Sequence, residues 1–156
     1  MIIAVVGFPR RGKSTYLSML YVSLRRRGQS FFVQRGCPDG EGQWTFETEG
    51  GKSLRVKGEF TERFINWVIQ STRGLSERFE RVYVDLGGRM SEENKRILRE
   101  AGVDGVIIVG ESVEEILEWV KFVRASVSVG KEVEIFAVLS RYDEERNEMT
   151  FKPIVL

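Results

Sequence analysis

One short segment near the start of the chain constrains its fold more than any other feature. An apolar run from Ile2 to Val6 is followed at once by GFPRRGKST, residues 7–15. The run is short and rich in β-branched residues, which predicts a strand buried on both faces of a parallel sheet. Residues 14–27 then place apolar side chains on one helical stripe and end in three arginines before Gly28, which favours a helix end there. Together these segments predict the opening of a β-α-β unit.

The turn between this strand and this helix matches the pattern G-x-x-x-x-G-K-[ST], which is typical of loops that bind phosphate groups. Gly7 and Gly12 allow backbone N–H groups to approach phosphate oxygens, and the helix adds the positive end of its dipole. Lys13 can reach the β- and γ-phosphates, Ser14 offers a hydroxyl to Mg²⁺, and Thr15 can donate to the α-phosphate. We therefore predict a P-loop that binds a nucleoside triphosphate with Mg²⁺.

Such a site needs a carboxylate that holds Mg²⁺, at the end of a strand next to the first one. Residues 81–85 form an apolar segment that ends at Asp85, and residues 85–88 match the D-x-x-G pattern of GTPase-like switches. Gly87 and Gly88 allow a backbone N–H to approach a γ-phosphate. We predict Ser14 and Asp85 as the metal ligands, with a loop-capping aspartate as the alternative for Asp85.

Three arginines flank these motifs. Arg10 and Arg11 lie between the two P-loop glycines and are candidates for further phosphate or partner contacts, although the sequence favours a solvated loop tip. Arg89 follows the D-x-x-G pattern directly and is a candidate for stabilising charge on a transferring phosphoryl group. A solvated surface arginine is an equal alternative for Arg89.

The remaining sequence predicts one α/β domain, residues 1–156, with a three-layer, doubly wound and mostly parallel sheet, because strand and helix patterns alternate. After a second strand that begins at Phe31, residues 36–58 are glycine-rich and predict a small insertion made of a loop and a β-hairpin. The further predicted segments are a helix at 60–73, a strand at 81–85, a helix at 92–101, a strand at 106–109, a helix at 113–127, a strand at 133–139 and an edge strand at 151–156.

The loop of the insertion follows the second strand and is expected to face the phosphates, since ligands bind beyond the carboxyl ends of parallel strands. The chain has no histidine, so a general base is expected to be a carboxylate. Asp39 and Glu41 are the candidates for orienting an attacking water or hydroxyl group. Simple turn chemistry around Pro38 is an equal alternative.

Base selectivity stays open between ATP and GTP. GTPases carry an [NT]-K-x-D motif after a late strand, where the aspartate reads guanine. Here the corresponding strand ends in Ser140-Arg141-Tyr142-Asp143, so only the aspartate matches. Asp143 belongs to an acidic cluster, and a solvated loop is the favoured interpretation.

Composition excludes several other classes of protein. The 156 residues carry 24 basic and 23 acidic side chains, one cysteine and no histidine. This excludes histidine-based zinc sites, histidine-dependent nucleophiles and an internal disulfide framework, and it argues against a broad nucleic-acid-binding face. The apolar runs are too short to span a membrane, and we expect no secretory signal in residues 1–13, because they lack a basic segment before the apolar run. We expect a cytoplasmic protein.

The chain also resembles one family. GFPRRGKST at 7–15, CPDGEGQW at 37–44 and VDLGGR at 84–89 with Ser91–Asn94 are similar to the P-loop NTPase domain attached to some CRISPR-associated ring-nuclease proteins. The resemblance covers about residues 2–142 and implies a kinase- or ATPase-like fold and a role in prokaryotic antiviral defence. The residues that it implies for nucleotide and Mg²⁺ are Gly7, Gly12, Lys13, Ser14 and Asp85. Nuclease activity is not implied, because the P-loop fold uses the whole chain.

Together these features predict Mg²⁺-dependent hydrolysis of a nucleoside triphosphate, or phosphoryl transfer to an acceptor that the sequence does not identify. The alternative is a nucleotide-dependent switch or partner-binding module with negligible turnover. A homodimer is left open, because P-loop sites often borrow an arginine from a partner.

Overall fold

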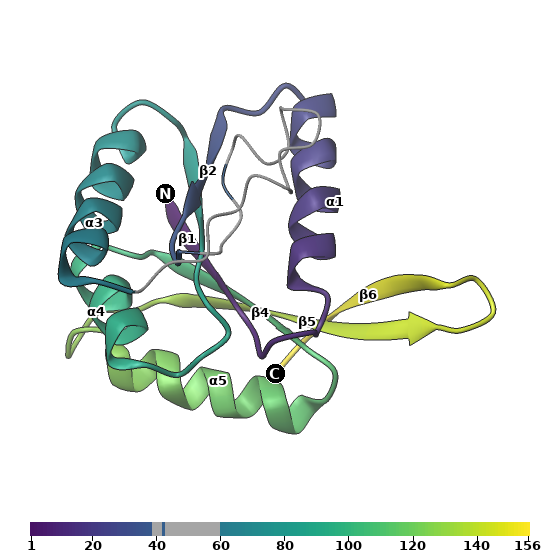
Figure 1. The fold of residues 1–156 in the computed structure, drawn as a ribbon. Coiled ribbons are helices and arrows are strands. Elements are labelled where there is room, and N and C mark those ends of the chain that lie inside the picture. Colours follow the sequence, from purple (N-terminus) through teal and green to yellow (C-terminus); the bar gives the residue numbers. More distant parts are fainter. Residues whose placement is uncertain (39–41, 43–59) are drawn as a thin grey trace.

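The computed structural model describes residues 1–38, 42 and 60–156. In this part of the chain six strands form one sheet, in the order β2-β3-β1-β4-β5-β6 (Figure 1). Their bounds are β1 (Ile2–Val6), β2 (Phe31–Arg35), β3 (Arg81–Asp85), β4 (Gly105–Gly110), β5 (Glu134–Asp143) and β6 (Glu148–Ile154). β1 to β5 are parallel, and β6 pairs antiparallel with β5 at one edge.

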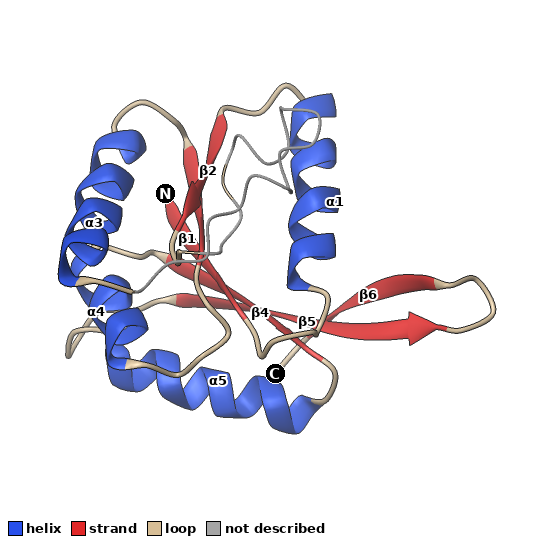
Figure 2. Cartoon of the chain, in the orientation of Figure 1, coloured by secondary structure: helices blue, strands red, loops and turns tan. Residues whose placement is uncertain are grey.

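Helices cover both faces of the sheet, which gives three layers (Figure 2). Among the described residues, one face carries α1 (Lys13–Arg26), and the other carries α3 (Glu62–Ser76), α4 (Glu92–Glu100) and α5 (Val113–Ser126). The predicted three-layer, mostly parallel α/β architecture is confirmed. The predicted hairpin insertion at 36–58 lies outside the described residues, apart from 36–38 and 42. No helix in the described ranges has the length and apolar character of a membrane span.

The position of β1 explains why the glycine-rich turn lies at the middle of the sheet. All five residues of β1 are buried, as the apolar run predicts. Ile3 and Val5 pack with Leu17 of α1, whereas Ala4 and Val6 belong to the core under α3, α4 and α5. Because β1 lies between β3 and β4, the turn that follows it emerges between the ends of these two strands.

The last two strands form a hairpin that reaches beyond the rest of the sheet (Figure 1). The edge strand predicted at 151–156 is present, but β6 starts earlier, at Glu148, and β5 continues to Asp143 instead of ending near Leu139. The cause is cross-strand pairing, in which Tyr142 lies opposite Met149. Hydrogen bonding between two strands therefore extends a segment that the sequence alone presents as a charged tail.

Candidate functional site

The backbone of the turn after β1 needs glycine at two positions. A Cβ atom at Gly7 would lie 2.3 Å from the carbonyl oxygen of Val109 in β4, so no larger residue fits there. Gly12 has a φ of 86°, a left-handed conformation that favours glycine, and a Cβ there would lie 2.8 Å from Met149 Cε. The two predicted glycines therefore meet steric demands of the strand-to-helix connection.

Gly12 is also the N-cap of α1, and it has no side chain to accept hydrogen bonds from the first-turn N–H groups. The other three described helices differ, because Thr61, Ser91 and Ser112 cap them through their hydroxyl oxygens. Ser14 and Thr15 lie in the first turn of α1, where Ser14 is half-buried and Thr15 is exposed. No side-chain cap therefore accepts from the first-turn N–H groups of α1, and these groups together with the positive end of the helix dipole suit an anion.

Lys13 and Asp85 are brought together by the pairing of two neighbouring strands. Val5 of β1 lies opposite Asp85 of β3 in the parallel register. Asp85 is only 2% exposed, and its Oδ1 lies 3.0 Å from Lys13 Nζ. Lys13 Nζ also donates a hydrogen bond to the carbonyl oxygen of Leu86. A buried carboxylate and an ammonium group thus lie beside the turn, at the carboxyl end of the sheet.

Residues 85–89 form a loop that contacts both the turn and α4. Asn94, 1% exposed, donates from its Nδ2 to the carbonyl oxygens of Gly87, at 3.0 Å, and Arg89, at 2.8 Å. Because the peptide between Gly87 and Gly88 is trans, the Gly88 N–H points away from Asn94. A Cβ at Gly88 would lie 2.8 Å from Pro9 Cδ, so the two loops touch.

A cleft of about 540 Å³ lies next to this contact. Pro9, Gly88, the exposed Arg89 and the carboxylate-bearing Glu93 are among the residues that line it. Arg89 is thus an exposed cation that lines the space beside both loops. Asp39 and Glu41, the predicted orienting carboxylates, lie outside the described residues.

The two P-loop arginines have different surroundings. Arg10 is exposed, with a φ of 64°. Arg11 Nε lies 3.0 Å from both carboxylate oxygens of Glu115 and 3.5 Å from Glu111 Oε2, at the start of α5. This hydrogen bonding from Arg11 lowers the pKa of Glu115, and the same contact raises the pKa of Arg11. Arg11 is thus bound by carboxylates instead of being free at a solvated loop tip.

No family model and no curated protein sequence matches this chain. Solved structures do match. The kinase domain of Escherichia coli tyrosine kinase ETK aligns with a TM-score of 0.58 at 14% identity, over 86% of this chain and 64% of that one. A nucleotide-binding protein from Archaeoglobus fulgidus in complex with ADP aligns with a TM-score of 0.58 at 14% identity, over 96% of this chain and 71% of that one.

Chloroplast FtsY from Physcomitrella patens aligns with a TM-score of 0.55 at 16% identity, over 99% of this chain and 61% of that one. The chain shares the fold of these solved structures. At these identities the likeness concerns the fold alone, and this chain spans less than two thirds of the length of the ETK and FtsY chains.

The donor atoms beside the P-loop suit Mg²⁺. This ion prefers oxygen ligands and is usually held by one or two carboxylates together with substrate phosphates and water. Asp85 supplies a buried carboxylate and Ser14 a hydroxyl group at the start of α1. The described residues contain no cluster of three or more histidine, cysteine, aspartate or glutamate side chains that would hold a metal without a phosphate. Asp85 and Ser14 are thus oxygen donors of the kind that Mg²⁺ prefers.

Sequence reasoning missed Asn94 and Glu93 as site residues, since both look like ordinary first-turn residues of a capped helix. The signal that was available is their spacing from the Ser91 cap, which places them beside the D-x-x-G loop.

Asp143, the candidate for reading a guanine base, is the last residue of β5. Its Oδ1 accepts hydrogen bonds from the backbone N–H groups of Glu145 and Arg146, at 3.1 and 3.3 Å. Asp143 is thus the partly buried last residue of β5 and binds the backbone of the hairpin turn, whereas the sequence favoured a solvated loop.

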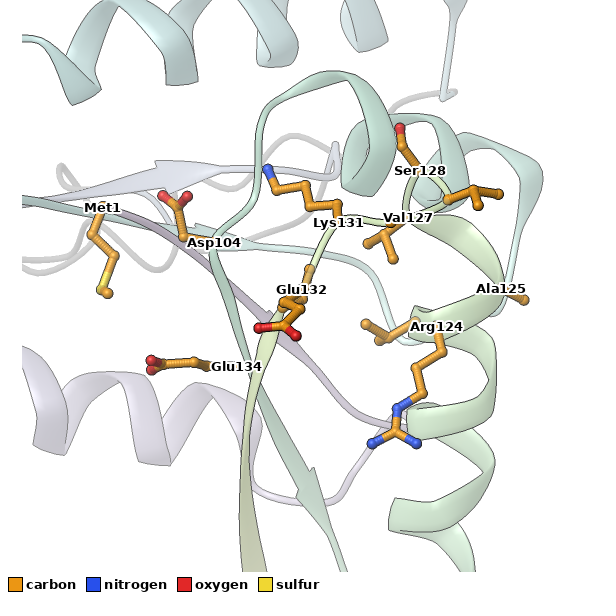
Figure 3. A pocket seen from close by; sticks show the side chains of 13 residues that line it. Met1, Asp104, Arg124, Ala125, Val127, Ser128, Lys131, Glu132 and Glu134 are labelled. Carbon is orange, nitrogen blue, oxygen red and sulfur yellow. The ribbon is translucent and has the colours of Figure 1, made fainter.

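A second cavity of about 1070 Å³ lies at the amino ends of the parallel strands, opposite the candidate site (Figure 3). Met1, Asp104 and Glu134, which line it, lie at the amino ends of β1, β4 and β5. Lys131 and Glu132, on the loop between α5 and β5, add charges of both signs (Figure 3). The P-loop motif and Asp85 are at the other ends of these parallel strands, so this cavity is separate from the candidate site.

Proposed function

We propose that this chain is a Mg²⁺-dependent P-loop NTPase domain that binds a nucleoside triphosphate and hydrolyses it or transfers its γ-phosphoryl group. The observation that carries the proposal is the pairing of Lys13 with the buried Asp85, 3.0 Å apart, beside a helix start without a side-chain cap. ATP is the preferred candidate and GTP the alternative. The resemblance noted in the sequence motivates a place in CRISPR-associated defence.

Each residue has a separate role in this proposal. The backbone around Gly7 and Gly12 surrounds the phosphates, Lys13 binds their β- and γ-oxygens, and Thr15 donates to the α-phosphate. Because Lys13 already contacts Asp85 and Leu86, the phosphates compete with these groups for its ammonium. The flanking Arg10 is exposed and free of the carboxylates that bind Arg11, so Arg10 is the arginine proposed to approach the phosphates.

Asp85 and Ser14 would hold Mg²⁺, which neutralises charge on the phosphates when it is bound. The Gly88 N–H, turned away from Asn94, and the exposed Arg89 are proposed to stabilise the γ-phosphoryl group. Asp39 or Glu41 is proposed to orient the attacking water or hydroxyl group. Glu93 is a further carboxylate for that task, since it lines the same cleft.

The second candidate function is a nucleotide-dependent switch with negligible turnover. The contact between Gly88 and Pro9 favours it, because a loop that touches the P-loop directly can respond to the presence of a γ-phosphate. Measurement of products separates the two functions. Phosphate release without an acceptor indicates an NTPase, labelled acceptor indicates a kinase, and tight binding without product indicates a switch.

Replacement of Lys13 tests the binding step that both functions share. We expect Lys13→Ala to weaken MgATP binding at least about tenfold in calorimetry, because one charge-assisted contact to the phosphates is lost. Arg26→Ala is the matched control, since it removes an exposed cation from the far end of the same helix. Equal MgATP affinity in the wild type and Lys13→Ala would contradict the proposed phosphate site.

A further inference from the structure

The β5–β6 hairpin lies beside the P-loop, and its register places four side chains on one face. Directly paired residues of antiparallel strands lie on the same face, as do residues two apart along a strand. Tyr142 pairs with Met149, and Ser140 pairs with Phe151. These four side chains therefore share a face, and the intervening Arg141 lies on the opposite one.

Two contacts show that this shared face is turned towards the P-loop and α1. The ring of Phe151 packs edge-on against Tyr16 of α1, with centroids 5.4 Å apart. Met149 Cε lies 2.8 Å from the position that a Cβ at Gly12 would occupy. Ser140 is buried and donates its hydroxyl to the carbonyl oxygen of Gly110, at 3.2 Å, which ties β5 to β4. The hairpin is thus held against the loop at its base.

The outer end of the same face is open. Tyr142 is 50% exposed, although it lies beside the half-buried Met149. The hydroxyl of Tyr142 donates to Asn147 Oδ1 in the hairpin turn, which orients the ring. An exposed aromatic ring next to a thioether offers a platform on which a planar group can stack.

The order of the strands indicates which part of the nucleotide reaches this platform. The γ-phosphate end is expected on the β3 side, where Asp85 and the cleft beside Gly88 lie. The sheet continues from β1 through β4 to β5 and β6 on the other side. A triphosphate that lies across the turn therefore directs its nucleoside towards the hairpin.

We propose that Tyr142 and Met149 form the contact surface for the nucleobase. This inference rests on the proposed nucleotide binding and adds how the base is recognised. Stacking accepts any purine because every base has a π-face, so it differs from recognition by an aspartate that reads guanine. Asp143 does not replace that recognition, since its carboxylate is bound to the backbone of the hairpin turn.

The test compares nucleotides with inorganic tripolyphosphate, which has the phosphates and no base. Calorimetry with Mg²⁺ would measure ATP, GTP and tripolyphosphate on the wild type, Tyr142→Ala and Lys152→Ala. Lys152 is the matched control, because it pairs with Leu139 on the opposite face of the hairpin and is exposed. We expect Tyr142→Ala to weaken ATP and GTP about tenfold each, with tripolyphosphate unchanged, as for loss of one stacking contact. Lys152→Ala should match the wild type.

Different failures overturn different claims. Unchanged ATP affinity in Tyr142→Ala, with tripolyphosphate still bound, would overturn the base contact and leave the P-loop function intact. An equal loss of ATP and tripolyphosphate would also overturn it, because the hairpin would then only support the loop. If the wild type binds neither ligand, the proposed function fails, and this inference fails with it. Met149→Ala, with folding checked by circular dichroism, repeats the comparison at the second residue.

Discussion

Asn94 is a single buried side chain that holds two backbone carbonyls of the loop after β3. Asparagine suits this place because its amide carries two donor hydrogens, and the carbonyls of Gly87 and Arg89 accept both. Aspartate of the same shape would bring only acceptors to these carbonyls. The direction of the Gly88 N–H therefore depends on a residue that contacts no phosphate in the proposed mechanism.

Asn94→Ala should lower MgATP affinity more than MgADP affinity, because the freed loop is proposed to contact the γ-phosphate alone. The free energy of unfolding should fall by about 1–3 kcal/mol, since the buried amide and its two partly buried hydrogen bonds are lost. Ser91→Ala is the matched control, because it removes the cap of the same helix and leaves both carbonyls bound. Equal losses for MgATP and MgADP would show that Asn94 only stabilises the fold.

At the scale of elements, one ion pair joins the P-loop to α5. Arg11 binds Glu115, whose Oε1 also accepts the backbone N–H of Glu111 at 3.0 Å. Glu115 therefore binds both the backbone just before α5 and the side chain of Arg11 in the loop. Each side chain is largely covered, with 30% exposure for Arg11 and 20% for Glu115. We infer that Arg11 positions the loop by anchoring it to α5.

Glu115→Gln should lower the free energy of unfolding by about 1 kcal/mol at neutral pH, the order expected for a partly exposed ion pair. The pH dependence has a definite sign. Because Arg11 holds the pKa of Glu115 below its unfolded value, the pair stabilises the fold above about pH 4.3. That stabilisation is lost as pH falls through the lower folded-state pKa. Urea unfolding of both proteins between pH 3 and 7 measures it, and a difference independent of pH would contradict the assignment.

The elements differ in how far the sequence predicts them. β1 and the P-loop turn are predictable, because buried apolar residues and two obligatory glycines are local signals. Asp85 is also predictable, since the end of an apolar strand marks it. The partner of Arg11 is separated from it by 104 residues, so no local pattern indicates it. The register of the β5–β6 hairpin likewise arises from cross-strand pairing. The polar and charged residues 143–148 carry no strand pattern, so the sequence does not predict this hairpin.

At the scale of the whole molecule, the site exists only when the sheet is complete. Lys13 comes from α1, Asp85 from β3, Asn94 from α4, and Met149 from β6, which are distant in sequence. A ligand that needs these elements together binds the folded chain and not the unfolded one. Nucleotide binding should therefore stabilise the entire domain by mass action.

MgATP at a hundred times its dissociation constant should add about 2.7 kcal/mol and raise the melting temperature by roughly 5–10 °C for a domain of this size. Differential scanning fluorimetry measures the shift of each variant against its own ligand-free value. That comparison is needed because Lys13→Ala removes the ammonium from a buried carboxylate and lowers stability by itself. MgATP should raise the melting temperature of Lys13→Ala only slightly. It should raise that of Lys131→Ala, at the cavity by the amino ends of the strands, as much as that of the wild type. An equal shift in Lys13→Ala would place the nucleotide elsewhere on the molecule, and a shift lost in Lys131→Ala would point to that second cavity.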